Sequence, residues 1–271
     1  MIKQAIIPLA GLGTRLLPLT SVFAKELLPI GGKPGIEYIL DECIEAGIKE
    51  VIFIISQKKI MIKKYFYNDK FYKNIIKHKK DPRILTEYKK ILKYKKMIKF
   101  VFQDKPLGTG DAVLKTKNLI KDKYFLMLLP DDLIAKHNCS KSMIAVHKKF
   151  NTSVMASMKV RKKEVSRWGI YDIKKKINNK NFEIKSVVEK PSINQAPSNN
   201  AVIGRYILPM TIFKKLSKLK AGKGGEIHIT DAIQSLIDDN NKFIGHSFSG
   251  KYLDCGTMNG YINSTLEIAK I

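Results

Sequence analysis

Short apolar runs alternate with segments of helical periodicity along the first half of the chain, and this alternation limits the possible folds more than any other feature. Residues 5–10, 51–55, 100–102 and 124–129 have the length and apolar content of buried strands. Between the first two runs, apolar side chains recur at helical spacing until Gly47 offers a stop: Ile36, Ile39, Leu40, Cys43 and Ile44. Such alternation is typical of α/β proteins, so we expect a Rossmann-like, mixed and mostly parallel central sheet flanked by helices.

The second half of the chain has a different pattern, with shorter strands after residue 153. Residues 170–173 and 184–188 predict a hairpin that turns around residues 177–181. Helices are predicted near residues 211–219 and 230–237, and a strand, a turn and a helix from Lys251 onward. We therefore expect a small β-rich portion that shapes a second binding pocket.

A lysine-rich stretch, residues 58–99, interrupts the strand pattern of the first half. Aromatic residues are interleaved with its lysines: Tyr65, Phe66, Tyr67, Phe71 and Tyr72. The simplest interpretation is a helical insertion whose aromatic residues pack against the body of the protein. A platform for single-stranded nucleic acid has a similar composition, but no strand alternation here would present the rings on one face of a sheet.

The formal net charge of +26 raises nucleic-acid binding as a second class of function. Only five of the 50 basic residues are arginine, however, whereas base readout and bidentate phosphate contacts favour the guanidinium group. Lysine, isoleucine and asparagine all have A/T-rich codons, so we interpret the charge chiefly as compositional bias. We expect no nucleic-acid partner.

The apolar runs and the cysteines indicate a cytoplasmic protein without a membrane partner. The longest strongly apolar runs, residues 51–55 and 125–129, are far too short to cross a bilayer. Cys43, Cys139 and Cys255 are an odd set without C-x-x-C spacing, so neither a disulfide framework nor a zinc site is expected.

A glycine loop directly follows the first predicted strand. Gly11 and Gly13 leave the backbone bare, so that its N–H groups can approach an anion closely, and Arg15 adds a planar cation. The dinucleotide fingerprint would need a glycine where Leu16 stands, and the Gly-Lys-Ser/Thr run of the P-loop is absent from the sequence. A purely structural turn would explain the glycine pair equally well.

The sequence that follows this loop makes its interpretation specific. The run AGLGTRLLPLTSVFAKELLPIGGKP, residues 10–34, resembles the signature of the sugar-1-phosphate nucleotidyltransferases, most closely the bacterial branch that uses UTP and glucose 1-phosphate. Further blocks occur in the same order along nearly the whole chain: QDKPLGTGDAVL (103–114), LPDD (129–132), RWGIYDI (167–173), EKP (189–191), APSNNAVIGRYIL (196–208), GGEIHITDAI (224–233) and LDCGT (253–257). Several blocks in family order are a stronger signal than any single one.

The resemblance implies the nucleotide-diphospho-sugar transferase fold and a reaction in which UTP and α-D-glucose 1-phosphate give UDP-glucose and pyrophosphate. It implies a single domain over residues 1–271, with a nucleotide-binding part over about 1–150. A sugar-phosphate-binding part and the C-terminal helix then occupy about 151–271. It further implies Mg²⁺ as cofactor, UTP and glucose 1-phosphate as partners, and a homo-oligomer, either a dimer or a tetramer.

The same resemblance assigns roles to individual residues. Catalytic roles are implied for Arg15, Lys25 and Lys190, and metal binding for Asp131 and Asp254. The implied nucleotide-binding residues are Ala10, Gly11, Gly13, Thr14, Glu26, Gln103 and Gly108, with the Gly110 backbone beside them; the implied sugar-phosphate residues are Gly169, Glu189, Lys190 and Asn199. We expect Asp132 to cap or solvate its loop, as turn aspartates commonly do.

Three other functions stay open from the sequence. The first is the same reaction with dTTP, because a pocket discriminates one methyl group by only about 1 to 3 kcal/mol. The second is a glycosyltransferase that consumes a nucleotide sugar, in which Asp131 and Asp132 would belong to an acidic metal-binding motif. The third is a basic nucleic-acid-binding protein.

The chain departs from the family pattern in three places. Ala24 stands where a proline usually precedes the lysine, and Gly32 replaces an acidic residue. The chain ends 17 residues after Asp254, which leaves less C-terminal helix than many relatives have and bears on the expected assembly.

Overall fold

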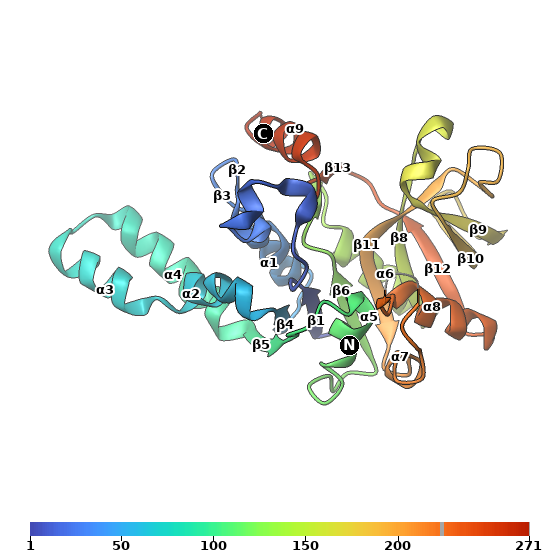
Figure 1. Ribbon diagram of the computed structural model, residues 1–271, viewed down its shortest axis with the longest axis horizontal. Helices are drawn as coiled ribbons and strands as arrows, with labels where there is room; N and C mark the ends of the chain where they lie inside the picture. The colour runs from blue at the N-terminus through green and yellow to red at the C-terminus, as the bar shows by residue number, and fades with distance from the viewer. Residues whose placement is uncertain (223–224, 271) are drawn as a thin grey trace.

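A nine-stranded sheet organises the computed structural model, which describes residues 1–222 and 225–270 (Figure 1). Its strand order is β5-β4-β1-β6-β11-β8-β12-β10-β9. In chain order these strands are β1 (Gln4–Pro8), β4 (Glu50–Ile55), β5 (Ile98–Phe102), β6 (Tyr124–Leu128), β8 (Ser153–Lys159), β9 (Gly169–Lys176), β10 (Asn181–Glu189), β11 (Asn200–Pro209) and β12 (Phe243–Ser247).

The strands of the first half form the parallel part of the sheet. β1 lies between β4 and β6 and is parallel to both, and β4 is parallel to β5. The predicted mixed α/β sheet is therefore confirmed, and so are the strands predicted at these positions. Because parallel strands end at one edge, the segments that follow β1, β5 and β6 meet there, as in other open α/β sheets.

The strands of the second half pair mainly in the antiparallel sense. β11 runs antiparallel to both β6 and β8, and the β9–β10 hairpin is antiparallel as predicted. β8 and β12 are a parallel pair within this half. Parallel pairing therefore dominates only in the first half, because β11 enters the sheet beside β6 in the opposite direction.

Helices cover both faces of the sheet, and the alternation within β1 shows this directly. Ala5 and Ile7 belong to one apolar core, whereas Ile6 belongs to the other. The first core is covered by α1 (Gly35–Glu45) and α6 (Cys139–Phe150), and the second by α5 (Gly108–Leu114), α7 (Ile212–Leu216) and α8 (Ile229–Asp238). A sheet buried on both faces reads as continuous apolar runs, which explains why its strands were easy to find in the sequence.

The lysine-rich insertion forms a helical arm that extends away from the sheet (Figure 1). Phe66 is buried, and its ring lies 5.9 Å from that of Phe53 in β4, so this aromatic residue packs against the body as predicted. Tyr72 is partly buried against the same apolar core and also stacks on Tyr88 within the arm. Phe71 is 54% exposed, so the prediction is wrong for this residue. The arm consists of α2 (Ile60–Tyr67), α3 (Asp69–His78) and α4 (Pro82–Met97).

Two small sheets and the last helix complete the described part of the chain. The helices predicted near residues 211–219 and 230–237 are α7 and α8, and the predicted final strand, turn and helix are also confirmed. Gly224, which begins one of the family blocks, lies outside the described residues. Within the described ranges, no helix is both long and apolar enough to cross a membrane. The remaining strands are β2 (Pro29–Ile30) with β3 (Lys33–Pro34) and β7 (Asp132–Ala135) with β13 (Lys251–Asp254), and the last α-helix is α9 (Met258–Ile268). Lys25 lies in a short 3-10 helix, Lys25–Leu27.

Candidate active site

A cavity of about 590 Å³ lies at the edge of the sheet where the parallel strands end. The glycine loop, the LPDD loop after β6 and the segment after β5 all contribute to its wall. Several residues with an implied role therefore share one cavity: Ala10, Gly11, Gly13, Thr14, Lys25, Glu26, Gln103, Gly108 and Asp131.

In the glycine loop, the backbone and the Arg15 side chain face open space. Gly13 has a φ of 73°, in the left-handed region that favours glycine, and its carbonyl accepts a hydrogen bond from Thr20 Oγ1 at 2.9 Å. A methyl group placed on Gly11 would meet no atom within 4 Å, so no other part of the protein fills the space beside it. The Arg15 side chain is 65% exposed. This loop can receive an anion without rearranging the core.

Lys25 and Arg15 converge on the carboxylate of Asp131. Lys25 Nζ lies 2.7 Å from Asp131 Oδ2, and Arg15 Nη2 lies 3.4 Å from the same oxygen. Burial alone would lower the pKa of Lys25, but the charges of Asp131 and Glu26 outweigh it and raise the pKa. Burial would likewise raise the pKa of Asp131, but Lys25 and Arg15 hold it below its usual value. Both groups are therefore charged at neutral pH.

Glu26 lines the same cavity, but its carboxylate has a protein partner. Lys59 Nζ donates to both of its oxygens at 2.7 and 2.8 Å, and both side chains are buried. Burial and the nearby charge of Lys25 lower the pKa of Lys59, against the opposing effect of Glu26. The sequence did not single out Lys59, because it is one lysine in a lysine-rich stretch.

Gln103 has a side-chain amide whose orientation is fixed by two acceptors. Its Nε2 donates to the Gly108 carbonyl at 3.1 Å and to Asp111 Oδ2 at 2.7 Å. Because both partners are acceptors only, the amide nitrogen must point toward them, and Oε1 is the acceptor that remains for a ligand.

Gly108 and Gly110 are glycines for a reason that the sequence did not reveal. Methyl groups on them would lie 2.6 and 2.8 Å from the carbonyl oxygen of Ile227, which packs directly against this segment. The backbone N–H of Gly110 donates to that carbonyl at 2.7 Å. The expected pairing of the Gly110 N–H with a base is therefore wrong, because that donor already has a protein partner.

Asp131 and Asp254 border one small space, although they come from distant parts of the chain. A methyl group on Gly256 would lie 2.8 Å from Asp131 Oδ2, 2.9 Å from Arg15 Nη2 and 3.3 Å from Asp254 Oδ1, so the Arg15 guanidinium borders the same space. The Cys255 N–H donates to the Asp131 carbonyl at 2.8 Å and ties the two segments together. Among the described residues no cluster of three or more His, Cys, Asp or Glu side chains could hold a metal ion. Two hard carboxylates suit a cation that completes its shell with water and phosphate oxygens.

Asp132 does not cap or solvate its loop, so that expectation is wrong. Its Oδ2 accepts from the Gly204 N–H at 2.7 Å and its Oδ1 accepts from the Tyr252 hydroxyl at 2.6 Å. Burial and the neighbouring Asp131 raise its pKa. Asp132 therefore joins the LPDD loop to β11 and β13.

Gly169, Glu189 and Lys190 come together at the end of the β9–β10 hairpin. Glu189 pairs with Gly169 in register, and a methyl group on Gly169 would lie 3.1 Å from Glu189 Oε2. Lys190 has a φ of 44° and donates its backbone N–H to the carbonyl of Trp168 at 3.0 Å, while its side chain is 64% exposed. The Lys190 ammonium lies 3.8 Å from Glu189 Oε1, so the two charges form a loose, exposed ion pair that a polar ligand can reach.

Asn199 lies apart from this group in its contacts. Its Nδ2 donates to the Val160 carbonyl at 3.3 Å, next to β8. No recorded contact joins it to Gly169, Glu189 or Lys190 within the described ranges.

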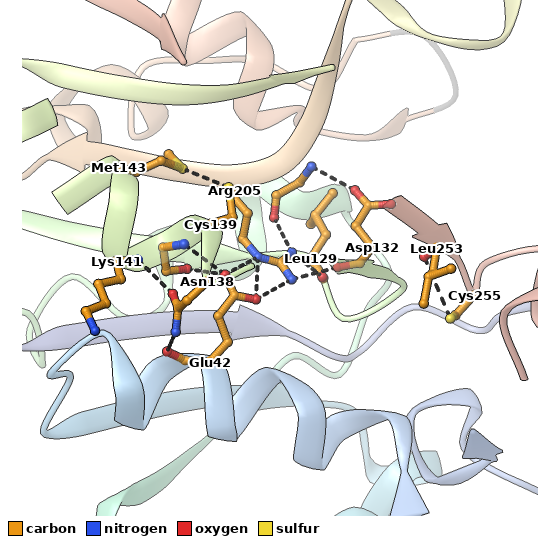
Figure 2. A network of polar contacts seen from close by, with 12 residues as sticks. Glu42, Leu129, Asp132, Asn138, Cys139, Lys141, Met143, Arg205, Leu253 and Cys255 are labelled. Atoms are coloured by element: carbon orange, nitrogen blue, oxygen red, sulfur yellow. Dashed lines mark hydrogen bonds and ion pairs between the residues drawn. The ribbon is translucent and has the colours of Figure 1, made fainter. Parts of the chain in front are cut away.

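A buried ion pair behind the LPDD loop also escaped the sequence analysis. Figure 2 shows Arg205 reaching from β11 to Glu42 of α1, with Nη2 2.8 Å from Glu42 Oε2. Arg205 is completely buried, and Ser140 donates to the same carboxylate through its backbone and its hydroxyl. Burial would raise the pKa of Glu42, but Arg205 and Ser140 lower it. The family block that contains Arg205 was recognised, but no role was assigned to this residue.

The fold and the site together define a nucleotide-transferring enzyme, and comparison with known proteins agrees. The model of the nucleotidyl transferase family matches residues 4–271, and the chain belongs to this family. It is 37% identical to the UTP–glucose-1-phosphate uridylyltransferase of Bacillus subtilis over 99% of this chain and 91% of that protein. A crystal structure of UDP-glucose pyrophosphorylase with UDP-glucose superposes with a TM-score of 0.87 at 36% identity, covering 100% of this chain and 99% of the other. The UTP-bound enzyme from Acinetobacter baumannii gives 0.89 at 32% identity, covering 99% and 93%.

Proposed function

We propose that this protein transfers UMP from UTP to α-D-glucose 1-phosphate and releases pyrophosphate, so that UDP-glucose is formed. The observation that carries the proposal is the convergence of Lys25 and Arg15 on Asp131 beside the bare glycine loop. Cations next to a carboxylate at the ligand-binding edge of an α/β sheet are suited to a metal-bound triphosphate. The full-length relatives named as uridylyltransferases support the choice of substrates.

The reaction needs alignment and charge neutralisation more than proton transfer. A phosphate monoester has a second pKa near about 6, so an oxygen of glucose 1-phosphate is anionic at neutral pH and can attack the α-phosphorus directly. A bond from that oxygen to the α-phosphorus forms, and the bond to the β-phosphate oxygen breaks as pyrophosphate leaves. Fixed cations are what such an in-line displacement requires.

The cleft residues divide this work between the two ends of the triphosphate. We assign Arg15 to the departing β- and γ-phosphates and Lys25 to the α-phosphate, with the backbone of Ala10, Gly11, Gly13 and Thr14 around them. The Lys59 ion pair favours a supporting role for Glu26, the residue next to Lys25, rather than direct contact with the nucleotide.

Gln103 is assigned to the base. Its remaining acceptor, Oε1, matches the N3–H donor of uracil, whereas cytosine presents an acceptor at that position. Thymine has the same N3–H, so this contact excludes CTP but not dTTP. The backbone of Gly108 is assigned to the base as well. Residue 108 must be glycine because Glu226 and Ile227 pack against it and leave no room for a side chain.

Glu189 and Lys190 are assigned to glucose 1-phosphate. Glu189 would accept hydrogen bonds from sugar hydroxyls beside Gly169, and Lys190 would meet the phosphate. A role for Asn199 in this pocket rests on the family resemblance alone, because its side chain bonds to the Val160 carbonyl and not to this group.

Mg²⁺ is proposed as the metal, held by Asp131 and Asp254. When bound it would neutralise phosphate charge and hold the phosphate oxygens in place. The two carboxylates around Gly256 fit a hard cation that shares its shell with the nucleotide.

A single set of assays tests the proposed reaction against its rivals. Pyrophosphate release is measured with UTP or dTTP crossed with glucose, galactose and N-acetylglucosamine 1-phosphates in the presence of Mg²⁺. We expect UTP with glucose 1-phosphate to be the best pair. Faster release from dTTP would favour the thymidylyltransferase. Transfer of glucose from UDP-glucose to an acceptor, with no release of pyrophosphate, would favour the glycosyltransferase. Tight, steeply salt-dependent binding of DNA or RNA would favour the nucleic-acid-binding protein.

Compartment and assembly are proposed on separate grounds. All three cysteines are free and buried, which supports a reducing compartment such as the cytoplasm. Ile262 and Leu266 lie one turn apart on α9 and are 49% and 56% exposed, which supports a homo-oligomer that covers this helix. Light scattering of the purified protein tests the assembly.

A further inference from the structure

Arg205 holds both ends of the dipeptide that carries the proposed metal ligand Asp131. Its Nη1 donates to the carbonyl of Leu129 at 3.1 Å, and its Nη2 donates to the carbonyl of Asp132 at 2.6 Å. These two carbonyls lie on either side of Pro130 and Asp131. Figure 2 shows the guanidinium between Leu129 and Asp132 on one side and Glu42 on the other.

Glu42 fixes the guanidinium that makes these contacts. The Nε of Arg205 lies 3.1 Å from both Glu42 oxygens, and Nη2 lies 2.8 Å from Oε2. The Glu42 carboxylate therefore fixes the orientation of the guanidinium plane. The remaining N–H groups of the guanidinium then point at the LPDD loop. A lysine has one ammonium in place of this fork and could not serve the carboxylate and both carbonyls together.

The same loop is tied to the strand that carries Asp254. Gly204, the neighbour of Arg205, donates its N–H to Asp132 Oδ2, and Tyr252 of β13 donates to Asp132 Oδ1. Asp254 lies opposite Asp132 in the β7–β13 pairing. Arg205 therefore holds the segment that carries Asp131, and Asp132 links this segment to the strand that carries Asp254.

We propose that Arg205 is a positioning residue for the metal site: by clamping the carbonyls of Leu129 and Asp132, it sets where the carboxylate of Asp131 stands relative to Asp254. It does not touch substrate and acts through the backbone. This inference rests on the proposed function, because it assigns the metal to Asp131 and Asp254.

The burial of this pair argues that it does more than stabilise the fold. Replacing a buried ion pair by uncharged residues is often neutral or stabilising, because both charges lose their hydration. The Arg205 guanidinium supplies what a pair of apolar side chains could not. It holds N–H donors at a fixed spacing for the carbonyls of Leu129 and Asp132. Outer-shell contacts of this kind typically change metal affinity or activity about 10- to 100-fold when removed.

The test removes the clamp without leaving a buried charge. In the double variant Arg205→Met with Glu42→Gln, the glutamine oxygen still accepts from Ser140. Mn²⁺ affinity is measured by electron paramagnetic resonance with UTP present and glucose 1-phosphate absent, so no turnover is needed. We expect the dissociation constant for Mn²⁺ to rise about 10- to 100-fold and the Mg²⁺ concentration for half-maximal activity to rise with it.

The matched control removes an ion pair that α1 makes with α4, in which Glu37 is buried and Lys90 is 31% exposed. Lys90 Nζ lies 2.5 Å from Glu37 Oε2 on α1, away from the LPDD loop. The variant Glu37→Gln with Lys90→Met should lower thermal stability but leave Mn²⁺ affinity unchanged. If the Arg205 double variant does not fold, Arg205→Lys, which keeps the charge opposite Glu42 but loses the fork, takes its place.

Two outcomes separate this inference from the proposed function. A wild-type protein that releases no pyrophosphate from UTP and glucose 1-phosphate overturns the proposed function. An active wild type, together with a folded clamp variant that binds Mn²⁺ as tightly as wild type, overturns the positioning role alone.

Discussion

Two ion-pair clusters contact the LPDD loop, and they differ in how far solvent reaches them. The cleft cluster is Arg15, Lys25 and Asp131, whose side chains are 65%, 13% and 17% exposed. The buried cluster is Glu42 and Arg205, at 9% and 0%. In the first cluster Lys25 and Asp131 line the cavity. The second cluster joins Glu42 of α1 to Arg205 of β11 and Ser140 of α6.

This difference indicates different tasks for similar chemical groups. In the cleft cluster water and ligands can reach the charges, so Lys25 and Arg15 can exchange Asp131 for phosphate oxygens. In the buried cluster the other partners are neutral, namely Ser140 for Glu42 and backbone carbonyls for Arg205. Separating the two charges would therefore leave a desolvated charge. The cleft cluster is suited to binding and release, and the buried cluster to holding a fixed geometry.

The largest expected effect comes from breaking the cleft cluster. Lys25→Ala and Asp131→Ala should each reduce kcat about a thousandfold or more, because each removes a charge that faces the reacting phosphates. Both proteins should keep their circular dichroism spectra. Pyrophosphate release is the measurement, and Lys141→Ala, which removes an exposed lysine paired loosely with Glu45, is the control. Wild-type rates in either cleft variant would refute its assigned role.

Breaking the buried cluster should instead change stability. Glu42→Gln leaves Arg205 without its counter-charge and should cost about 3 to 5 kcal/mol of unfolding free energy in urea titrations at pH 7. The pKa of Glu42 is lowered in the folded state, so its contribution is present above its unfolded value of 4.5 and is lost as pH falls through the folded pKa. The difference between variant and wild type should therefore shrink in acid. A difference of under 1 kcal/mol at pH 7 would contradict the comparison.

The sequence singled out the residues of the cleft cluster but not those of the buried one, and the reason is the way each is encoded. Lys25 stands in the recognisable motif that follows the first strand, and Asp131 stands in the LPDD motif at the end of another. Glu42 and Arg205 are 163 residues apart, and they meet only because β11 inserts antiparallel beside β6. Nothing local in the sequence specifies that pairing, since an apolar run fits either direction.

Asp132 shows the same limit at the scale of one residue. A turn aspartate ordinarily faces solvent, but here β11 and β13 bring the Gly204 N–H and the Tyr252 hydroxyl to its two oxygens. Both partners come from the half of the chain where strand direction could not be predicted. By contrast, the parallel half was predicted well because strands buried on both faces are continuous apolar runs.

A smaller effect is expected from replacing Lys190. Its side chain is exposed to solvent, like that of Arg15 in the cleft cluster and unlike those of the buried cluster. Lys190→Ala should raise the KM for glucose 1-phosphate about 10- to 100-fold, the cost of one charge-assisted hydrogen bond, and leave the KM for UTP unchanged. Initial rates at varied concentrations of each substrate provide the measurement. Lys185→Ala, which removes an exposed lysine of β10 paired with Asp172, is the matched control. An unaltered KM for glucose 1-phosphate would place the phosphate elsewhere.

The smallest expected effect tests whether Lys25 can exchange its partner Asp131 for the phosphates of a bound nucleotide. Lys25 occupies Asp131 Oδ2 at 2.7 Å, so it competes with any cation for that carboxylate when no triphosphate is present. A partly exposed ion pair is worth up to about 1 kcal/mol, so Lys25→Met should strengthen Mn²⁺ binding to the ligand-free protein by up to about fivefold. With UTP present the gain should vanish, because the phosphates draw Lys25 away in the wild type. Weaker Mn²⁺ binding in the ligand-free variant would show that Lys25 supports the carboxylate geometry instead, and the cleft cluster would then resemble the buried one.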